Sequence, residues 1–291
     1  MYGTVPYMTE RIAIVTGGAG GIGYHTALGL ARQDRQVIIA SRDRVRGEAA
    51  ATRIGAAWWE LNLGDLASVR RFAHRFLAAY AELDLLINNA GVMALPRSVT
   101  ADGFERQFGV NHLGHFALTG LLLPALTLSG RSRVVTVTSG LHRRGRIDFD
   151  DLMGERRYSK FGAYMQSKLA NVLFALELGR RAPITSVLAH PGVAHTDLAR
   201  TGNPLRSVLI ALARISAQSA EAGALPLLHA ATGPDVVTGD AYGPDGPGER
   251  RGAPTRIAVS DRGRDEEDAR RLWAISEQLT GVRYGTVSIP E

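Results

Sequence analysis

Residues 16–23 read TGGAGGIG and stand directly after a short apolar run at residues 12–15 and directly before a helical pattern. A glycine turn between a strand and a helix lets the backbone approach an anion that faces the positive end of the helix. Gly17, Gly21 and Gly23 suit the tight turn, the close approach to a pyrophosphate and the close packing of helix on strand. The stretch therefore predicts the first unit of a dinucleotide-binding α/β fold.

The rest of the chain alternates short apolar runs with longer helical patterns, which is typical of βαβ units. Strands are expected at residues 12–15, 37–40, 57–61, 83–87, 134–137, 185–189 and 240–242. Helices are expected at residues 22–33, 44–54, 68–80, 104–128, 161–180, 220–231 and 266–279. This order predicts a single-domain Rossmann fold over residues 1–291, with a doubly wound, seven-stranded parallel sheet and helices on both faces.

Composition narrows the function classes. The chain has 291 residues and no cysteine, which excludes disulfides, thiolate nucleophiles and cysteine-bound metals. Its net charge is +6, but the arginines are spread without a dense basic block, so we expect a solvated surface and no nucleic-acid partner. No signal peptide or run of about 18 apolar residues is present, so we expect no membrane span and a cytoplasmic protein, with residues 1–9 as a disordered extension.

Lysine is rare in this chain, because only Lys160 and Lys168 occur among 34 lysines and arginines. Lys168 follows Tyr164 by four residues within the sequence YMQSK, so both side chains lie on one face of the expected helix. A chain that otherwise uses arginine retains a compact ammonium here, which indicates a site beside a phenol and a cofactor ribose. The pair alone is suggestive, and the other motifs must support it.

The second expected strand ends at Ser41 and Arg42, about twenty residues after the glycine turn. NAD-binding proteins place an acid at this point to bind the ribose 2′-hydroxyl. Here a guanidinium suits the 2′-phosphate of NADP, with the hydroxyl of Ser41 as a second donor. The alternative is a solvent-facing arginine that Asp43 partly neutralises. The pattern favours NADP(H) as the cofactor.

Seven ordered motifs together resemble the short-chain dehydrogenase/reductase family over nearly the whole chain. They are TGGAGGIG, ASRD at 40–43, NNAG at 88–91, VNHLGHF at 110–116, VVTVTSG at 134–140, YMQSK at 164–168 and HPGVAHT at 190–196. The similarity is closest to the retinol-dehydrogenase-like branch and its bacterial relatives. Each residue implied by the resemblance below is an expectation for this chain.

The resemblance implies four catalytic residues. Tyr164 would be the acid in reduction and the base in oxidation, although a free phenol has a pKa of about 10. Lys168 would favour the phenolate and bind the nicotinamide ribose, and Ser139 would hold the substrate carbonyl, with Thr138 as a rival donor. Asn111 would complete a proton relay from Lys168 through a water. Alternatively, its side chain would form hydrogen bonds with the backbone of a distorted helix, and the two roles are compatible.

The resemblance also implies a set of cofactor contacts. Asn62 and Leu63 follow the third strand, where the family often has an acid that contacts adenine, so this contact loses a charge. The complete set expected to bind the cofactor is Gly17, Gly21, Ile22, Gly23, Ser41, Arg42, Asn62, Leu63, Asn88, Ala90, Gly91, Tyr164, Lys168, Pro191, Gly192, Val193 and Thr196.

Other features bear on substrate and assembly. The histidines at 112, 115, 142, 190 and 195 do not have the sequence spacing of metal ligands, so we expect no metal site.

The remaining segments bear on the substrate and on the oligomeric state. Residues 204–213 are apolar, and the resemblance implies that they form part of a substrate lid at 195–218 for an apolar or bulky substrate; the alternative is a surface helix that contacts a partner or a membrane. Residues 242–254 are expected to form a loop that borders the pocket. The family pairs the helices of Asn111 and Tyr164 between subunits, but residues 140–163 could obstruct this, so a homodimer or a monomer is expected.

These observations predict an NADP(H)-dependent oxidoreductase that transfers hydride between nicotinamide and a small-molecule carbonyl or alcohol. One alternative is the same fold redirected to C=C reduction or to a redox-neutral rearrangement, because fold does not determine function. Another is a regulator that senses NADP(H) without turnover. The joint presence of Ser139, Tyr164 and Lys168 disfavours a pure sensor.

Overall fold

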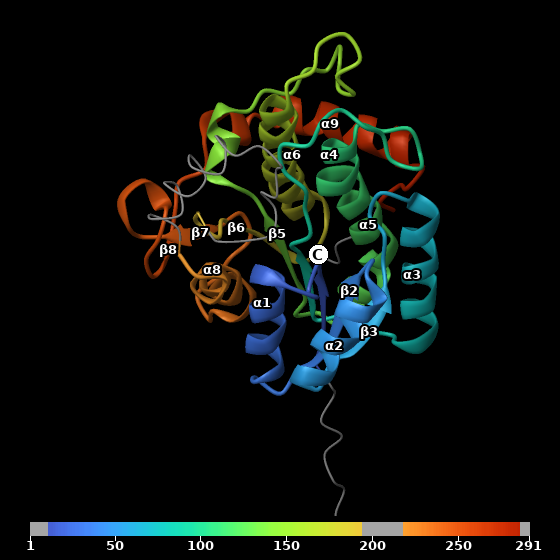
Figure 1. The fold of residues 1–291 in the computed structure, drawn as a ribbon, viewed down its shortest axis with the longest axis vertical. Coiled ribbons are helices and arrows are strands. Elements are labelled where there is room, and N and C mark those ends of the chain that lie inside the picture. Colours follow the sequence, from blue (N-terminus) through green and yellow to red (C-terminus); the bar gives the residue numbers. More distant parts are fainter. Residues whose placement is uncertain (1–10, 194–217, 286–291) are drawn as a thin grey trace, which may run out of the picture.

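A twisted sheet runs through the centre of the molecule, with helices on both of its faces (Figure 1). The structure is a computed structural model that describes residues 11–193 and 218–285. The sheet has eight strands within this part of the chain, in the order β3-β2-β1-β4-β5-β6-β7-β8. The first seven are parallel, as the sequence predicted, and the crossover between β1 and β4 creates the switch point of a doubly wound fold.

The elements follow the expected alternation. The strands are β1 Ile12–Thr16, β2 Gln36–Ser41, β3 Ala57–Glu60, β4 Leu85–Asn88, β5 Arg133–Val137, β6 Thr185–Ala189, β7 Ala241–Pro244 and β8 Pro254–Arg256. The α-helices are α1 Gly21–Ala31, α2 Arg44–Ile54, α3 Leu66–Ala79, α4 Arg106–Phe108, α5 Gly114–Leu128, α6 Lys160–Arg181, α8 Ala220–Thr232 and α9 Glu266–Thr280. Shorter turns are the π-helix η1 Gly109–Leu113 and the 3₁₀-helices η2 Gly140–Arg144, η4 Pro247–Glu249 and η5 Asp261–Arg264.

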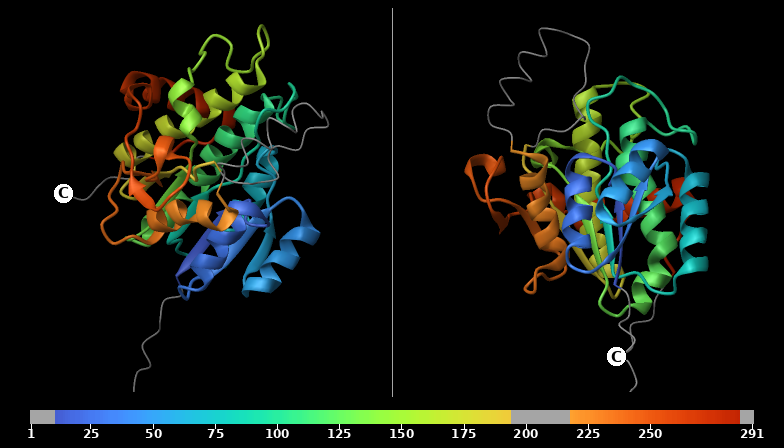
Figure 2. Two further views of the ribbon diagram at one scale, coloured as in Figure 1. Left: turned by 60° about the vertical axis from the view of Figure 1, so that its left-hand side comes forward. Right: turned by 60° about the horizontal axis from the view of Figure 1, so that its bottom comes forward.

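The pleat of the strands divides the core into two layers. In β1, Ile12 and Ile14 point into one hydrophobic cluster, whereas Ala13 and Val15 point into the other. The first cluster is covered by α3, α5 and α6, and the second by α1, α2 and α8. Figure 2 shows these helices on the two sides of the sheet. Because both faces of the sheet are buried, its strands are expected to have nearly continuous apolar sequences.

Two segments differ from the sequence prediction. Residues 242–254 were expected to form a loop, but β7 extends to Pro244 and β8 begins at Pro254, pairing antiparallel with β7. The strand β8 has only three residues and begins with a proline, so it has no apolar alternation to reveal it. The expected single helix at 104–128 is interrupted by η1, in which Gly114 N donates to Gly109 O across five residues.

The C-terminal helix α9 covers part of α5 and α6. Its Trp273 ring stacks on Phe174 of α6, with 5.9 Å between ring centroids and 22° between planes. After α9, the Tyr284 hydroxyl donates to the carbonyl of Phe116 on α5 at 2.7 Å. These contacts bury aromatic surface of both helices within the chain.

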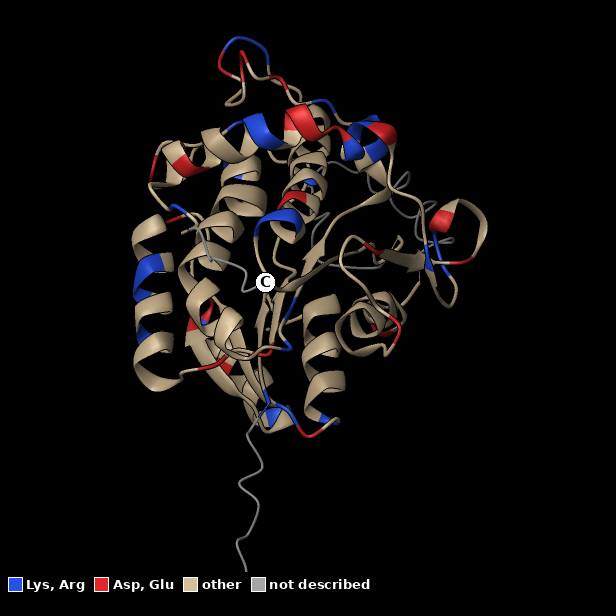
Figure 3. Cartoon of the chain, turned by 180° about the vertical axis from the view of Figure 1, so that it is seen from behind, with Lys and Arg blue, Asp and Glu red and all other residues tan. Residues whose placement is uncertain are grey.

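Charged residues lie mainly on the outer helices and loops. Figure 3 shows Lys and Arg interspersed with Asp and Glu on this side of the molecule, while the central strands carry little charge. None of the helices within residues 11–193 and 218–285 is long and apolar enough to cross a membrane.

Three histidines are buried beneath the carboxyl ends of the strands. His112 in η1 has its pKa lowered to about 3 by burial, and burial also lowers the pKa of His115 in α5 to about 4. His190 follows β6, and burial lowers its pKa to about 4. The His115 ring lies 2.9 Å from the Thr16 hydroxyl through Nε2 and 3.0 Å from the Asn111 carbonyl through Nδ1. All three rings are therefore neutral in the folded protein at neutral pH.

We predict that acid destabilises the fold well above the range in which carboxylates titrate. Below a pH of about 6.5 the unfolded chain binds protons at these histidines while the folded chain does not, so each one removes about 1.4 kcal/mol of unfolding free energy per pH unit. The three together should remove about 4 kcal/mol between about pH 7.5 and about pH 5.5. Urea unfolding measured across this range checks the slope.

The His112→Phe variant should lose about one third of that slope, since Phe is not titratable and the ring packs among Phe108, Phe116 and Phe174. His74 on α3 is exposed, so His74→Gln is the matched control and should keep the slope. A wild-type unfolding free energy that stays constant between these pH values would contradict the account.

Candidate active site

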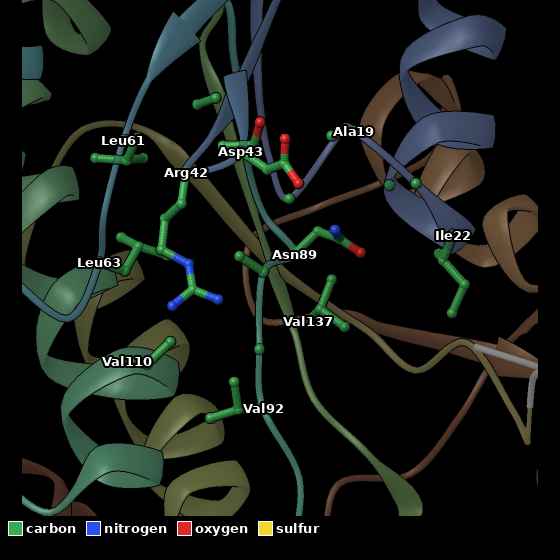
Figure 4. Close-up of a pocket in the computed structure, with 18 of the residues that line it drawn as sticks. Ala19, Ile22, Arg42, Asp43, Leu61, Leu63, Asn89, Val92, Val110 and Val137 are labelled. Carbon is green, nitrogen blue, oxygen red and sulfur yellow. The ribbon is translucent and has the colours of Figure 1, made fainter. Parts of the chain in front are cut away.

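A crevice of about 1000 Å³ opens at the carboxyl ends of β1, β2 and β4, next to the switch point of the sheet (Figure 4). Most of the predicted cofactor residues line it. They are Gly17, Gly21, Ile22, Gly23, Ser41, Arg42, Asn62, Leu63, Ala90, Gly91, Tyr164, Lys168 and Pro191. The fold thus brings residues from six segments of the chain to one cavity of a size suited to a dinucleotide.

The glycine turn forms the floor of the crevice. Gly17 adopts a φ of +68°, and a Cβ built on Gly23 would lie 2.4 Å from the Gly17 carbonyl oxygen. No residue with a side chain could therefore stand at position 23 without moving the turn. The helix α1 begins after Gly20 without a side-chain cap, so its first N–H groups face the crevice as donors for an anion.

Two guanidinium groups line the same part of the crevice. Arg42 reaches into it beside Leu63, whereas Asp43 lies toward Ala19 (Figure 4). Arg46 was missed by the sequence analysis; a Cβ built on Gly20 would lie 3.0 Å from its Nη2 atom. The signal was available, because Arg46 belongs to the first turn of α2, which starts directly after the second strand.

Asp43 has a structural partner that limits its effect on Arg42. Its Oδ1 atom accepts a hydrogen bond of 3.0 Å from Arg46 N and caps the N-terminus of α2. A carboxylate at a helix N-terminus is partly compensated by the helix dipole. Asp43 is therefore engaged by the N-terminus of α2, and Arg42 and Arg46 both line this side of the crevice.

The segment after β3 forms the wall expected at the adenine. Leu61, Asn62 and Leu63 all line the crevice. The Asn62 Oδ1 atom accepts a hydrogen bond from Gly64 N at 3.1 Å, which holds this side chain in the turn. The side-chain oxygen of Asn62 is thus engaged by the backbone, and a contact with the adenine base would use the side-chain NH₂ group or the second lone pair of this oxygen.

Asn88 is a correction to the sequence prediction. It is 1% exposed, does not line the crevice, and donates through Nδ2 to the Thr119 hydroxyl of α5 at 3.0 Å. The next residue, Asn89, lines the crevice instead and donates through Nδ2 to the carbonyl of Thr16 at 2.8 Å. Alternate residues of a strand point to opposite faces, so an error of one position exchanges the two asparagines.

Tyr164 projects from α6 toward the crevice. It is 9% exposed, and burial raises its pKa to about 12, while a hydrogen bond with Ser139 acts in the opposite direction. The structure thus brings Tyr164 and Ser139 together from α6 and from the end of β5, although 25 residues separate them in sequence. The phenol is protonated at neutral pH in this environment.

Lys168 lies one turn after Tyr164 on the same face of α6. Its Nζ atom donates to the Val137 carbonyl at 3.1 Å and lies 5.8 Å from the centroid of the Tyr164 ring. Burial lowers the pKa of Lys168 to about 8, so it is mainly protonated at neutral pH. A Cβ built on Gly91 would lie 3.6 Å from Nζ, an ordinary contact distance, so the ammonium lies beside the loop after β4.

The two candidate donors after β5 have different partners. The Thr138 hydroxyl donates to the Lys168 carbonyl at 3.0 Å and is buried. The Ser139 hydroxyl accepts a hydrogen bond from Leu141 N at 3.3 Å, which leaves its proton for another acceptor. Thr138 therefore fixes α6 against β5, and Ser139 is the hydroxyl with a proton to donate.

Asn111 lies in the π-helix η1 and is fully buried. Its side chain exchanges two hydrogen bonds with the backbone of Val92, of 2.8 and 2.9 Å, and donates to the Ser167 hydroxyl at 2.9 Å. The amide therefore joins the loop after β4 to α6 beside Lys168. Its side chain is engaged by protein groups, so a relay through Asn111 would use its backbone carbonyl.

The turn after β6 lies on the other side of the crevice. Pro191 lines it, and Gly192 has a φ of +70° with a position for Cβ only 2.5 Å from the Arg250 carbonyl. Val193 is 40% exposed and does not line the crevice, and its N–H donates to the same carbonyl at 2.9 Å. The predicted contact at Thr196 and the predicted lid at 195–218, except for Gln218, fall outside the described residues.

The loop between β7 and β8 lies beside the serine-bearing turn. Arg143 of η2 forms two hydrogen bonds of 2.8 and 2.7 Å with the Glu249 carboxylate. The Nδ1–H group of His142 donates to the Ser139 carbonyl at 2.7 Å. This loop therefore borders the site through the turn that carries Ser139.

Within the part of the chain that the structure describes, no three side chains of His, Cys, Asp or Glu come together as a metal site. A match to the family model described as short chain dehydrogenase spans residues 11–205. This match includes the glycine turn, Ser139, Tyr164 and Lys168.

The chain belongs to the short-chain dehydrogenase/reductase family.

Named relatives place this dehydrogenase/reductase in the retinol-dehydrogenase-like branch. It is 45% identical to polyprenol dehydrogenase of Mus musculus, over 97% of this chain and 87% of that protein. It is 42% identical to retinol dehydrogenase 12 of Homo sapiens, over 94% of this chain and 87% of that protein. Members of this family act on alcohols and carbonyls, so the chain is an oxidoreductase of that class.

Solved structures agree with the fold of this dehydrogenase/reductase. An uncharacterised protein from Mycobacterium Paratuberculosis has a TM-score of 0.80 and 44% identity, over 94% of this chain and 95% of that chain. The NADP active-site complex of Pseudomonas aeruginosa RhlG has a TM-score of 0.64 and 25% identity, over 80% of this chain and 94% of that chain.

Proposed function

We propose that this enzyme uses NADP(H) to interconvert an alcohol and a carbonyl on an apolar or bulky small molecule. The observation that carries the proposal is the meeting of Tyr164 and Lys168 at the crevice, which both residues line, with Ser139 hydrogen-bonded to Tyr164. The crevice itself suits a dinucleotide, because it measures about 1000 Å³ and its floor is the glycine turn that opens into helix α1. When bound, the nicotinamide supplies or accepts the hydride.

Tyr164 would move the proton in this mechanism. With a pKa raised to about 12 by burial, its phenol is protonated and can donate to the substrate oxygen during reduction. In oxidation the phenol must lose its proton, and the Lys168 ammonium 5.8 Å from the ring centroid favours that form. Ser139 would donate to the same substrate oxygen and stabilise its negative charge.

Lys168 would hold the nicotinamide ribose as well as assist Tyr164. Its ammonium has three protons, and one is engaged by the Val137 carbonyl. The Asn111 side chain keeps Val92 and the adjacent Gly91 close to this ammonium. We propose that protons reach Lys168 from solvent along a path that includes a water at the Asn111 carbonyl.

The preference for NADP(H) is proposed from the charges around the end of β2. Arg42 and Arg46 both line the crevice there, Ser41 adds a hydroxyl, and the nearby carboxylate of Asp43 caps α2. A 2′-phosphate would receive charge-assisted hydrogen bonds from this set, whereas a 2′-hydroxyl offers these guanidinium groups no negative charge to bind. The NADP in the RhlG complex supports the same cofactor class.

We predict that Arg42→Asp lowers kcat/KM for NADPH at least about tenfold and changes the value for NADH much less. The loss should appear mainly in the Michaelis constant, because the phosphate is remote from the hydride. Steady-state kinetics with both cofactors check this result. Arg44→Asp is the matched control, since Arg44 is also near the start of α2 but pairs with Glu48 at 2.8 Å on the surface. An unchanged cofactor preference in Arg42→Asp would remove Arg42 from the role.

The substrate is proposed from the relatives, whose names specify retinol and polyprenol. Both are apolar isoprenoid alcohols, so we propose an apolar alcohol or its aldehyde or ketone for this enzyme. The apolar sequence at 204–213 supports the same class. A panel of carbonyl compounds of increasing chain length, assayed with NADPH, tests it; activity confined to small polar carbonyls would contradict this substrate class.

A homodimer remains our expectation alongside a monomer. Its interface would need surface other than the parts of α5 and α6 that Trp273 and Tyr284 already cover. Light scattering of the purified protein gives the mass of the assembly directly.

A further inference from the structure

Trp58 lies behind the proposed 2′-phosphate site. It stands on β3, and its indole Nε1 donates a hydrogen bond of 2.9 Å to the Ser41 hydroxyl at the end of β2. Ser41 lines the crevice next to Arg42, whereas Trp58 does not line it. The indole therefore contacts a candidate cofactor ligand from the side that faces away from the cofactor.

This contact determines how the hydroxyl can bond. An indole N–H is a donor only, so the Ser41 hydroxyl must accept from Trp58 and cannot donate its own proton to the indole. Among residues 11–193 and 218–285 no acceptor for that proton lies within hydrogen-bonding distance. The proton is thus available to an acceptor in the crevice, and accepting one hydrogen bond strengthens a hydroxyl as a donor.

Gly47 makes the contact possible. It lies in the interior of α2, where glycine is unfavourable relative to alanine. A Cβ built on Gly47 would lie 2.1 Å from both Cδ1 and Nε1 of Trp58, and these atoms belong to a rigid ring. The absence of a side chain at Gly47 therefore lets the indole lie against α2 and reach Ser41.

We propose that Trp58 is a positioning residue that commits the Ser41 hydroxyl to donate to the cofactor 2′-phosphate. A phosphate accepts from every donor, whereas a ribose 2′-hydroxyl both donates and accepts and can adapt to other partners. In this arrangement Arg42 and Arg46 supply positive charge, and Trp58 orients the Ser41 hydroxyl so that it donates its hydrogen bond into the crevice. The inference rests on the proposed use of NADP(H) and names a further determinant of that preference.

The first test is Trp58→Phe, which keeps an aromatic ring over Gly47 and removes the N–H donor. The ratio of kcat/KM for NADPH to that for NADH should fall about fivefold, through KM for NADPH, with kcat at saturating NADPH little changed. Trp59→Phe is the matched control, because the adjacent Trp59 packs in the opposite layer of the core. It should leave the ratio unchanged.

A double-mutant cycle distinguishes an effect of Trp58 through the Ser41 hydroxyl from an effect through packing of the indole. If Trp58 acts through Ser41, then Trp58→Phe should change the ratio in the wild-type background and not in a Ser41→Ala background. Gly47→Ala should lower the ratio by a similar factor by displacing the indole, which keeps the test available if Trp58→Phe folds poorly.

The outcomes distinguish the inference from the proposed function. A fivefold fall that persists in the Ser41→Ala background would assign Trp58 to packing and overturn the inference. An unchanged ratio in Trp58→Phe and Gly47→Ala, with a large change in Arg42→Asp, would overturn it and leave NADP(H) use intact. A wild-type enzyme that does not prefer NADPH over NADH would overturn the proposed cofactor itself.

Discussion

Replacing Tyr164 with phenylalanine is expected to lower kcat by about 10³-fold, because the variant loses the proton donor to the substrate oxygen. Phenylalanine keeps the ring that packs beside Lys168, so the fold and the affinity for NADPH should change little. Single-turnover oxidation of NADPH with a carbonyl substrate measures the chemical step, and fluorescence titration measures NADPH binding. The expected result is slow chemistry with nearly normal cofactor binding.

Tyr158 provides the matched control. It is half-buried, its pKa is likewise raised to about 12, mainly by burial, and its hydroxyl donates to the Leu95 carbonyl at 2.9 Å. Because Tyr158 does not line the crevice, Tyr158→Phe should keep kcat within about threefold of the wild type. If Tyr164→Phe retained more than a tenth of the wild-type kcat, Tyr164 would not be the proton donor.

Replacing Lys168 with arginine is expected to lower kcat/KM by about 10²-fold even though the charge is kept. Lys168 is 4% exposed, and its ammonium donates to the Val137 carbonyl and lies near Gly91. A planar guanidinium has a different donor geometry and cannot make the contacts of this compact ammonium from the same position. Lys168→Met should lose at least as much, since it also removes the charge.

The other lysine of the chain is the natural control. Lys160 begins α6 two turns before Lys168, and its backbone carbonyl, not its side chain, accepts the hydrogen bond from Gln107. Lys160→Arg should therefore keep kcat/KM close to the wild-type value, by the same steady-state measurement. Equal activity of Lys168→Arg and Lys160→Arg would show that any cation suffices at position 168 and would contradict the account.

The sequence predicted the parts of this enzyme that depend on local order. The glycine turn, the seven parallel strands and the four-residue spacing of Tyr164 and Lys168 all follow from patterns of a few residues. One helix was expected at 104–128, distorted at Asn111 in one reading, and the π-helix η1 was not predicted. A π-helical turn depends on tertiary packing, and Gly114 lies against the Leu63 carbonyl from a distant part of the chain.

The sequence could not predict which side chains cross between elements. The choice between Asn88 and Asn89 depends on the pleat phase at the end of β4, and a shift of one residue reverses it. Arg46 enters the crevice because α2 starts beside the glycine turn. The bond from Trp58 to Ser41 requires the pairing of β2 with β3 and the space at Gly47. The placements of Asn89 and Trp58 are tertiary contacts with no local signature, whereas the position of Arg46 in the first turn of α2 is visible in the sequence.

The central claim is that Tyr164, Ser139 and Lys168 catalyse hydride transfer between NADP(H) and an apolar alcohol or carbonyl compound. The most direct measurement is to incubate the enzyme with NADPH that carries deuterium on the reactive nicotinamide carbon, together with an apolar aldehyde or ketone, and to analyse the product by mass spectrometry. The account predicts an alcohol with one deuterium on the former carbonyl carbon, formed by the wild type and nearly absent with Tyr164→Phe. Deuterium placed on an alkene carbon, or tight NADPH binding without product from any carbonyl, would contradict it.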